Sequence, residues 1–395
     1  MPLCLRGEKL RPNRCPAGPG RYNPEMLRRL EFWPDWKIAL AVTVFLRVSF
    51  TVVAAVASPF LHPDPALIHS NALTENLPAP GTLHYALFGI WERFDTLWYL
   101  HIAAHGYDRP MAVIFYPLYP AAIRVMSWAM PATVAALAVS TVAAFFAFWG
   151  LLRLAAEHTA VGRQRMILIF GVWPPSFILF AGYADSLTLA LVAWAVVFGR
   201  QRRWERATAC GLMAGIARPT GILVCVPLAL MALRSRQVRS LVVAMLPLGF
   251  AGYWYWLRMT GRPPVVEAYR LYQGMTMAAP WQCLAEAVRL IAREHDALLA
   301  IKLAIVVAFA VISMRRGFRL EDKAFAIALI LQMLMYTGRP LLGAARYVLL
   351  VYPAFLQLGS WAERWNGKQL GFCLVASGML NLAWMWAFLN WSLVL

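Results

Sequence analysis

Residues 91–120, WERFDTLWYLHIAAHGYDRPMAVIFYPLYP, stand apart from a chain that otherwise alternates between long apolar runs and short connectors. The stretch is too polar to cross a bilayer, and it is too aromatic for a plain solvated loop. Tryptophan and tyrosine favour the headgroup layer, where an apolar ring and a polar edge are both satisfied. We therefore expect an interfacial helix over residues 94–104 that ends at Gly106. Asp95 lies at its start, and an acid held at the membrane surface marks a candidate functional site.

Composition identifies the class of protein. The 395 residues are 61% hydrophobic and 14% charged, with a mean hydropathy of +0.58. Soluble domains carry about 25% charged residues, so this is an all-α polytopic membrane protein. The net charge of +18 does not indicate nucleic-acid binding, because the basic residues cluster in short loops between apolar runs. The six scattered cysteines form no C-x-x-C pair and predict neither a disulfide framework nor a zinc site.

The apolar runs predict about 11 transmembrane helices in one domain, residues 37–395, preceded by a basic cytoplasmic tail, residues 1–36. Of the 37 Lys and Arg residues, 24 fall in the segments placed inside and 12 in those placed outside. This bias places residues 91–130 outside as an interfacial catalytic loop, and residues 258–296 as a second outer loop. The protein is then a multi-pass integral membrane protein with its site on the extracytoplasmic side.

Several apolar runs are interrupted near their outer ends by proline, glycine or charge, as at residues 173–175, 182–186, 217–221 and 338–340. Broken backbone at membrane depth is tolerated where it is buried or lines a cavity. The sequence therefore predicts one polar cavity open to the outer leaflet, with several charged residues at these outer ends: Asp95, Asp185, Arg218, Glu267, Arg270, Arg339 and Arg346.

The residue types in this cavity suit transfer from a lipid-phosphate donor. Arginine makes bidentate contacts with phosphate and keeps its charge when it is desolvated. A carboxylate beside it can take a proton from an attacking hydroxyl group. We expect Asp95 to be this base and Arg218 and Arg346 to hold the phosphate. The sequence has no phosphate-binding G-x-x-x-x-G-K-[ST] loop, which argues against ATP.

Two of these assignments have a structural alternative. Asp95 could form an ordinary surface ion pair with Arg93. Arg47, near the middle of the first apolar run, either pairs with a carboxylate or carbonyl groups inside the bundle or helps to hold an anionic lipid phosphate.

Three further features can also be explained without a ligand. The Tyr-Ala-Asp-Ser turn at residues 183–186 could cap the following helix, because Asp and Ser suit that position. Arg218 could extend along the helix to reach the membrane surface. His101 and His105 fit interfacial packing and capping better than acid–base chemistry.

Five motifs in this order resemble the PIG-V family of mannosyltransferases, within the GT-C class of membrane glycosyltransferases. They are Phe94-Asp95 with Ile102-Ala103-Ala104-His105-Gly106-Tyr107, then Phe115-Tyr116-Pro117-Leu118-Tyr119-Pro120, Tyr183-Ala184-Asp185-Ser186, Arg218-Pro219-Thr220-Gly221, and Arg346-Tyr347 followed by Pro353. The similarity in order and spacing covers residues 37–360. The turn departs from the family in having Asp185 where a Glu is expected.

The resemblance implies inverting transfer of a hexose, mannose in the family, from a polyprenyl-phosphate donor to a hydroxyl group of a lipid-linked or other extracytoplasmic acceptor. Asp95 is then the general base. We assign the donor phosphate and sugar to Arg218, Arg346, Tyr347, Asp185, Tyr183 and Arg47, and the acceptor and interface to His105, Tyr107, Tyr116 and Trp98. No metal ligands or cofactor are predicted, although the reaction is compatible with a divalent cation. The short loops favour a bacterial relative in the inner membrane; a eukaryotic relative would lie in the ER membrane.

A transporter or flippase of a lipid-linked sugar is the competing hypothesis, because such proteins also carry broken helices and buried arginines. A transporter is expected to show inverted internal repeats, and none is evident in the sequence. That hypothesis also gives no reason for an acid in an external amphipathic helix.

Overall fold

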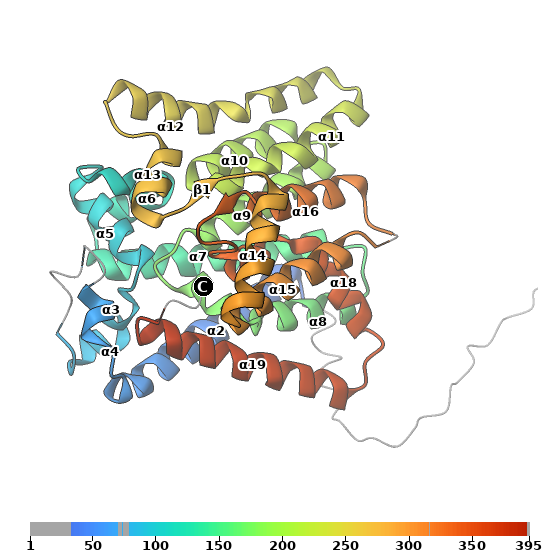
Figure 1. Ribbon diagram of the computed structural model, residues 1–395. Coiled ribbons are helices and arrows are strands. Elements are labelled where there is room, and N and C mark those ends of the chain that lie inside the picture. Colours follow the sequence, from blue (N-terminus) through green and yellow to red (C-terminus); the bar gives the residue numbers. More distant parts are fainter. Residues whose placement is uncertain (1–32, 70–72, 74–78, 316, 393–395) are drawn as a thin grey trace, which may run out of the picture. The chain divides into compact units, whose positions relative to one another are not determined.

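The computed structural model describes residues 33–69, 73, 79–315 and 317–392. The cytoplasmic tail predicted for residues 1–36 therefore lies almost wholly outside the described residues, as does the amphipathic helix expected around residues 24–36. From Pro34 onward the chain forms one compact unit. It is helical except for one pair of two-residue strands, so the predicted all-α fold is confirmed (Figure 1).

The described elements are helices and one strand pair, with several 3₁₀ segments, labelled η, at the breaks. The first part of the chain comprises α2 (Asp35–Ala57), η1 (Ser58–Phe60), α3 (Pro65–His69), α4 (Leu83–Leu87), η3 (Gly89–Trp91), α5 (Asp95–His105), η4 (Pro110–Ile114), α6 (Leu118–Met126), α7 (Ala132–Leu154), α8 (Ala160–Gly171), η5 (Pro174–Phe180), α9 (Asp185–Arg200) and α10 (Trp204–Ala217). The second part comprises η6 (Pro219–Val224), α11 (Cys225–Ser235), η7 (Val238–Met245), α12 (Pro247–Met259), α13 (Val265–Gln273), β1 (Thr276–Met277), α14 (Pro280–Glu294), α15 (Ala297–Ser313), α16 (Leu320–Met333), β2 (Tyr336–Thr337), α17 (Ala344–Tyr347), η8 (Val348–Leu350), α18 (Tyr352–Ala362) and α19 (Gly367–Leu389).

Four helical segments among the described residues are long and apolar enough to cross a membrane: Asp35–Phe60, Ala132–Leu154, Val238–Met259 and Gly367–Leu389. A fifth is reached if η5 and α9 are counted as one span, although they are bent by 94° at the turn between them. The other expected spans are shorter helices, such as the 12-residue α8, which at 1.5 Å per residue covers about 18 Å. The number of eleven spans stays a prediction.

Helices form over the segments for which the sequence predicted interfacial helices. Helix α5 begins at Asp95 and ends at Gly106, whose positive φ of 76° is a conformation that glycine adopts without strain. The expected surface helices after it and in the second outer loop correspond to α6 and α14. Pro117 caps α6 and Pro120 lies in its first turn, as expected of residues that shape the entry to a helix.

Two expectations for the last third of the chain were wrong. The span expected over residues 343–361 is broken into α17, η8 and α18, and Pro353 occupies the first turn of α18, where its missing N–H can be tolerated. The span expected over residues 324–337 ends at Met333, and residues 336–337 pair as an antiparallel strand with residues 276–277. This small sheet joins the second outer loop to the segment that leads into α17.

The bundle core is built on α9. Helices α7, α10 and α11 pack against it, and α2 packs against the other side of α7. Close approach of α7 and α9 depends on a glycine, since a Cβ atom at Gly150 would lie 2.8 Å from the Cβ of Ala193. The broken segments η5 and η6 also contact α9, which places their turns beside its first residue, Asp185.

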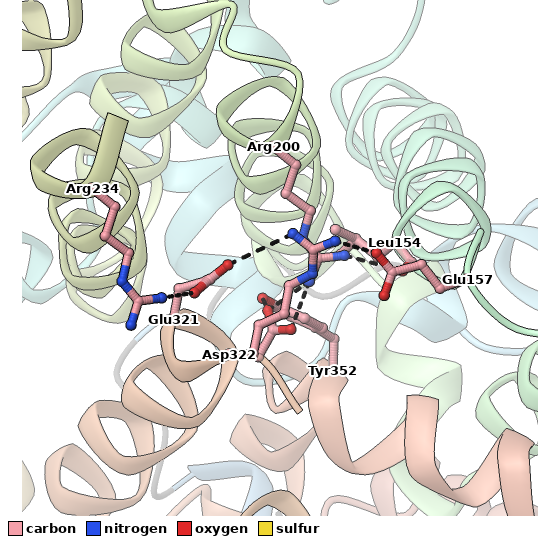
Figure 2. Close-up of polar contacts among 8 residues, drawn as sticks. Leu154, Glu157, Arg200, Arg234, Glu321, Asp322 and Tyr352 are labelled. Atoms are coloured by element: carbon pink, nitrogen blue, oxygen red, sulfur yellow. Dashed lines mark hydrogen bonds and ion pairs between the residues drawn. The ribbon is translucent and has the colours of Figure 1, made fainter. Parts of the chain in front are cut away.

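At the other end of α9, a charged cluster ties the bundle together (Figure 2). The Nη2 atom of Arg200 donates to both carboxylate oxygens of Asp322, at 2.6 and 2.7 Å, and its Nη1 atom donates to the carbonyl of Leu154. The Tyr352 hydroxyl donates to the same carboxylate, and Arg234 pairs with Glu321 at 3.1 Å. Together these contacts link α7, α9, α11, α16 and α18 at the end that the charge distribution places in the cytoplasm.

Candidate functional site

A cavity of about 410 Å³ lies where the expected outer ends of the helices meet. We call it the site cavity. Its charged lining residues are Asp95, Arg218, Arg339 and Arg346. Seven tyrosines also line it: Tyr99, Tyr116, Tyr183, Tyr269, Tyr272, Tyr336 and Tyr347. One acid and several arginines therefore share one polar cavity, as the sequence predicted.

The carboxylate of Asp95 is held at the start of α5 by an unusual backbone conformation. Phe94, which caps the helix, has a φ of 48° and a ψ of −116°. Such a conformation costs about 1–3 kcal/mol in a residue with a side chain, and it is typical of functional sites. The ring of Phe94 packs against Phe388 and Trp391, which holds the turn in place. The Asp95 side chain remains 28% exposed, so its carboxylate is accessible from the cavity.

Arg346 connects the two acids of the site. Its Nη1 atom donates to Oδ2 of Asp95 at 2.8 Å, and its Nε atom lies 3.6 Å from Oδ1 of Asp185. The ion pair of Asp95 with Arg93, which the sequence left open, is not observed. Arg93 instead donates to the Leu389 carbonyl and to the Tyr85 hydroxyl.

Asp185 is the buried anchor of two of the three cavity arginines, Arg218 and Arg346. It is 4% exposed, and its Oδ1 atom forms an ion pair with Nη1 of Arg218 as well as facing Arg346. It makes no helix-capping bond: Ala184 is the residue that caps α9, without a side-chain hydrogen bond. The capping interpretation of this turn is therefore wrong, and Asp185 is a positioning residue behind the cavity wall.

Both guanidinium groups also lie over tyrosine rings. Arg218 is 5.0 Å from the ring centre of Tyr347, and Arg346 is 5.2 Å from that of Tyr183 and 5.3 Å from that of Tyr347. At 7% and 9% exposed, the two arginines do not extend to the surface. The rings and Asp185 fix the planes of the guanidinium groups, which favours bidentate contact with an anion.

Glycines explain two of the sequence motifs. A Cβ atom at Gly182 would lie 2.5 Å from Cγ2 of Thr96, so the turn before Asp185 presses directly on the residue after Asp95. A Cβ atom at Gly221 would overlap the carbonyl group of Ala214 in α10. The chain after Arg218 can therefore fold back onto α10 only if this residue has no side chain.

The residues assigned to the acceptor divide into two groups. Trp98 and Tyr116 line the cavity; Trp98 stacks on Phe115 at 5.6 Å, and the Tyr116 hydroxyl accepts a bond from Trp254. Tyr107 and His105 do not line it. The Tyr107 hydroxyl donates to the Phe115 carbonyl, and burial raises the pKa of Tyr107 well above its ordinary value.

The histidines and Arg47 have structural partners outside the cavity. His105 is exposed and lies against His101, which shares a hydrogen bond of 2.6 Å with Asp108. Arg47 donates to the carbonyl of Phe180 at 2.7 Å, which is the bundle-internal alternative left open by the sequence. The structure does not bring Arg47 to the donor residues.

Sequence reasoning missed one wall of the cavity. Tyr269 and Tyr272 come from α13, Tyr336 from β2, and Gln332 from the end of α16. Burial raises the pKa of Tyr269 well above its usual value, so this hydroxyl group stays protonated and remains a hydrogen-bond donor. The only available signal was the run of tyrosines in the second outer loop. Glu267 and Arg270, expected in the cavity, are exposed and pair with each other at 2.5 Å.

Within the described part of the chain, no group of three or more His, Cys, Asp or Glu side chains has the arrangement of a metal site. Only Asp95 contributes a carboxylate to the cavity surface, as the charged lining residues show.

Comparisons with known proteins give little direct guidance. No protein-family model matches the chain, and no curated protein matches it. Among solved structures, the chain is similar to that of ArnT from Cupriavidus metallidurans bound to undecaprenyl phosphate. Sequence identity is 14% and the TM-score is 0.49, over 89% of this chain and 76% of that one. A similarity this distant assigns neither a family nor a function to the chain.

Proposed function

We propose that this protein is an inverting glycosyltransferase of the GT-C class, which moves a hexose from a polyprenyl-phosphate donor to a hydroxyl group of an extracytoplasmic acceptor. Mannose is the sugar that the motif resemblance favours. The observation that carries the proposal is the pairing of Asp95 with Arg346 at 2.8 Å in a cavity that also contains Arg218. An accessible carboxylate and buried, oriented guanidinium groups are the two components that this reaction needs.

Asp95 is the general base of the proposed reaction. Its carboxylate accepts the proton of the attacking acceptor hydroxyl as the new bond forms at the anomeric carbon. The bond from that carbon to the phosphate oxygen breaks on the opposite face, so the configuration inverts. A single carboxylate is sufficient, because a phosphate leaves without needing much protonation.

Charge supports a phosphate at the arginines. Arg218, Arg339 and Arg346 contribute three positive charges around the cavity, and Asp95 and Asp185 contribute two negative charges. The excess of one positive charge matches the single negative charge of a phosphodiester. Arg339 is exposed and forms no ion pair with any described acid, which leaves it available to an incoming anion. As the sugar leaves, the phosphate gains negative charge, and fixed guanidinium groups stabilise that change.

Binding of the donor would also give Arg346 an additional anionic partner. In the described structure this guanidinium is shared between the two carboxylates. A phosphate that draws Arg346 away from Asp95 would leave that carboxylate free to accept a proton. Binding of the donor and activation of the base are then coupled through one side chain.

The competing transporter hypothesis explains the arginines but not the base. A flippase needs to release its substrate unchanged, and it gains nothing from a strained turn that presents a carboxylate to the bound lipid. Asp95 with the Phe94 backbone conformation therefore favours chemistry over transport.

A transfer assay distinguishes the glycosyltransferase from the transporter hypothesis. Purified protein is incubated with radiolabelled polyprenyl-phosphate-mannose and a membrane lipid extract, and the products are separated by chromatography. The proposal predicts that label moves to an acceptor and that polyprenyl phosphate is released. Binding of the donor without any transfer, together with movement of the labelled lipid across a vesicle membrane, would support the transporter.

A further inference from the structure

Two polar side chains of the site cavity lack a partner among the described residues. The Oε1 atom of Gln332 and the Oγ1 atom of Thr220 are both buried and form no hydrogen bond there, and both residues line the cavity. Thr220 is 3% exposed. A buried polar group without a partner costs about 1–3 kcal/mol, so such groups call for an explanation.

Thr220 and Gln332 lie in the part of the cavity near the arginines that are proposed to hold the donor phosphate. Thr220 follows Arg218 by two residues, at the start of η6, and η6 packs against α16, which carries Gln332 near its end. Both residues belong to the lining of the cavity that Arg218 and Arg346 also line. A group attached to a phosphate at these arginines would therefore be close to Thr220 and Gln332.

The chemistry of this wall fits an uncharged sugar. A glutamine amide offers both a donor and an acceptor, and a threonine hydroxyl offers either, which matches the hydroxyl groups of a hexose. Tyr269 and Tyr336 add aromatic surface and further hydroxyl groups beside them. No acid lines this wall that would favour an amino sugar, since Asp95 is the only acidic residue of the cavity lining.

We propose that Gln332 and Thr220 form the subsite that recognises the hydroxyl groups of the donor hexose. This inference rests on the proposed function, because it takes the cavity arginines as the phosphate site. The sugar satisfies the two unpartnered groups, so the subsite contributes to the binding of a sugar-bearing lipid and not to that of the bare lipid phosphate.

The test compares two probes on purified protein in lipid nanodiscs: polyprenyl phosphate and polyprenyl-phosphate-mannose. Affinities are measured for the wild type, Gln332→Leu and Thr220→Val, which remove the polar atoms and nearly keep the volume. Each variant is expected to bind the mannose-bearing lipid about tenfold more weakly, or about 1.4 kcal/mol, and polyprenyl phosphate within about twofold of the wild type. Gln201→Leu, an exposed glutamine at the end of α9, is the matched control for the first substitution.

A rescue variant separates recognition from packing. Thr220→Ser keeps the hydroxyl group and loses a methyl group, so recognition of the sugar predicts near-wild-type affinity for both probes. A purely structural role of Thr220 predicts that Ser and Val variants weaken both probes alike, and this result would overturn the inference.

Two further outcomes distinguish failure of the subsite from failure of the proposed function. If Gln332→Leu and Thr220→Val bind both probes as the wild type does, the subsite is wrong and the proposed function stands. If the wild type binds neither probe, the phosphate site fails, and the subsite fails with it. Thermal unfolding of each variant confirms that it is folded, and Gln332→Met, which is uncharged and of similar length, serves as the second variant if Gln332→Leu does not fold.

Discussion

At the residue scale, the site depends on how two acids share two arginines. Asp95 is the exposed member and Asp185 the buried one, and Arg346 contacts both. The same side chain that neutralises Asp95 in the described structure is therefore anchored from behind by Asp185. Substitution of Asp185 is therefore expected to affect the stability of the protein, and substitution of Asp95 the rate of transfer.

Loss of the buried acid is expected to destabilise the protein. Asp185→Asn removes the countercharge of Arg218 and weakens that of Arg346, both of which are buried. Breaking a buried ion pair costs about 3–5 kcal/mol, because the remaining charge is left uncompensated. Thermal unfolding in detergent should show a clear decrease in Tm. Glu267→Gln, which removes an exposed ion pair, is the control and is expected to leave Tm unchanged. An equal Tm for Asp185→Asn and the wild type would contradict the anchoring role.

A glycine substitution tests how closely the Asp95 position is constrained. Gly182→Ala would place a Cβ atom 2.5 Å from Thr96, so the start of α5 has to shift. A displacement of about 1 Å at a catalytic group can cost about a hundredfold in rate, so the transfer rate should fall by up to that factor while donor affinity changes little. Gly252→Ala, with no atom within 4 Å of the added Cβ, is the control. Unchanged transfer by Gly182→Ala would show that this contact does not position the base.

At the element scale, the interrupted helices contribute turns and charged residues to the site, and the continuous helices pack around them. Segments η5, η6 and α17 each end an apolar run early and bring a turn or charged residue to the first residue of α9. The charged cluster around Arg200 and Asp322 secures the opposite end of the same helix (Figure 2). Each end of α9 thus carries its own charged cluster, and only the cluster at Asp185 adjoins the site cavity.

A substitution in the cluster around Arg200 and Asp322 should therefore lower the stability of the protein without changing its affinity for the donor lipid. Asp322→Asn leaves Arg200 without its carboxylate and weakens the bond from Tyr352, at a cost of about 3–5 kcal/mol. None of the residues in this cluster lines the cavity, so the affinity for polyprenyl phosphate at low temperature should stay near that of the wild type. Glu157→Gln, in the exposed pair with Arg319, should change Tm very little. A large loss of affinity in folded Asp322→Asn would contradict this prediction.

The sequence predicted where the apolar helices are interrupted better than it predicted which neighbours a given side chain contacts. Proline, glycine and charge inside apolar runs predicted the turns that hold Asp185 and Arg218, because few backbone conformations accept those residues. Arg47 was misplaced for the opposite reason: its position predicts depth in the membrane, but which neighbour it faces depends on how helices pack. The pairing of β1 with β2 was missed because two-residue strands have no periodicity to detect.

At the scale of the whole molecule, orientation decides what the cavity can bind. The distribution of Lys and Arg predicts that the cavity lies outside and the Arg200 cluster inside. A single cysteine introduced by Trp281→Cys in α14, where the side chain is 72% exposed, should react with a membrane-impermeant maleimide in intact cells, in a background without native cysteines. Arg202→Cys, between α9 and α10, should react only after the membrane is opened. The reverse labelling pattern would place the site in the cytoplasm.

In the proposed reaction, Asp95 is the base for transfer from a polyprenyl-phosphate sugar. The most direct measurement is a single-turnover assay with Asp95→Asn and saturating polyprenyl-phosphate-mannose, with donor affinity measured on the same preparation. The substitution keeps the shape of the side chain and removes its ability to take a proton. If Asp95 is the base, Asp95→Asn should bind the donor within a few-fold of the wild type and transfer the sugar about a hundredfold or more slowly. Equal transfer rates in Asp95→Asn and the wild type would contradict this role.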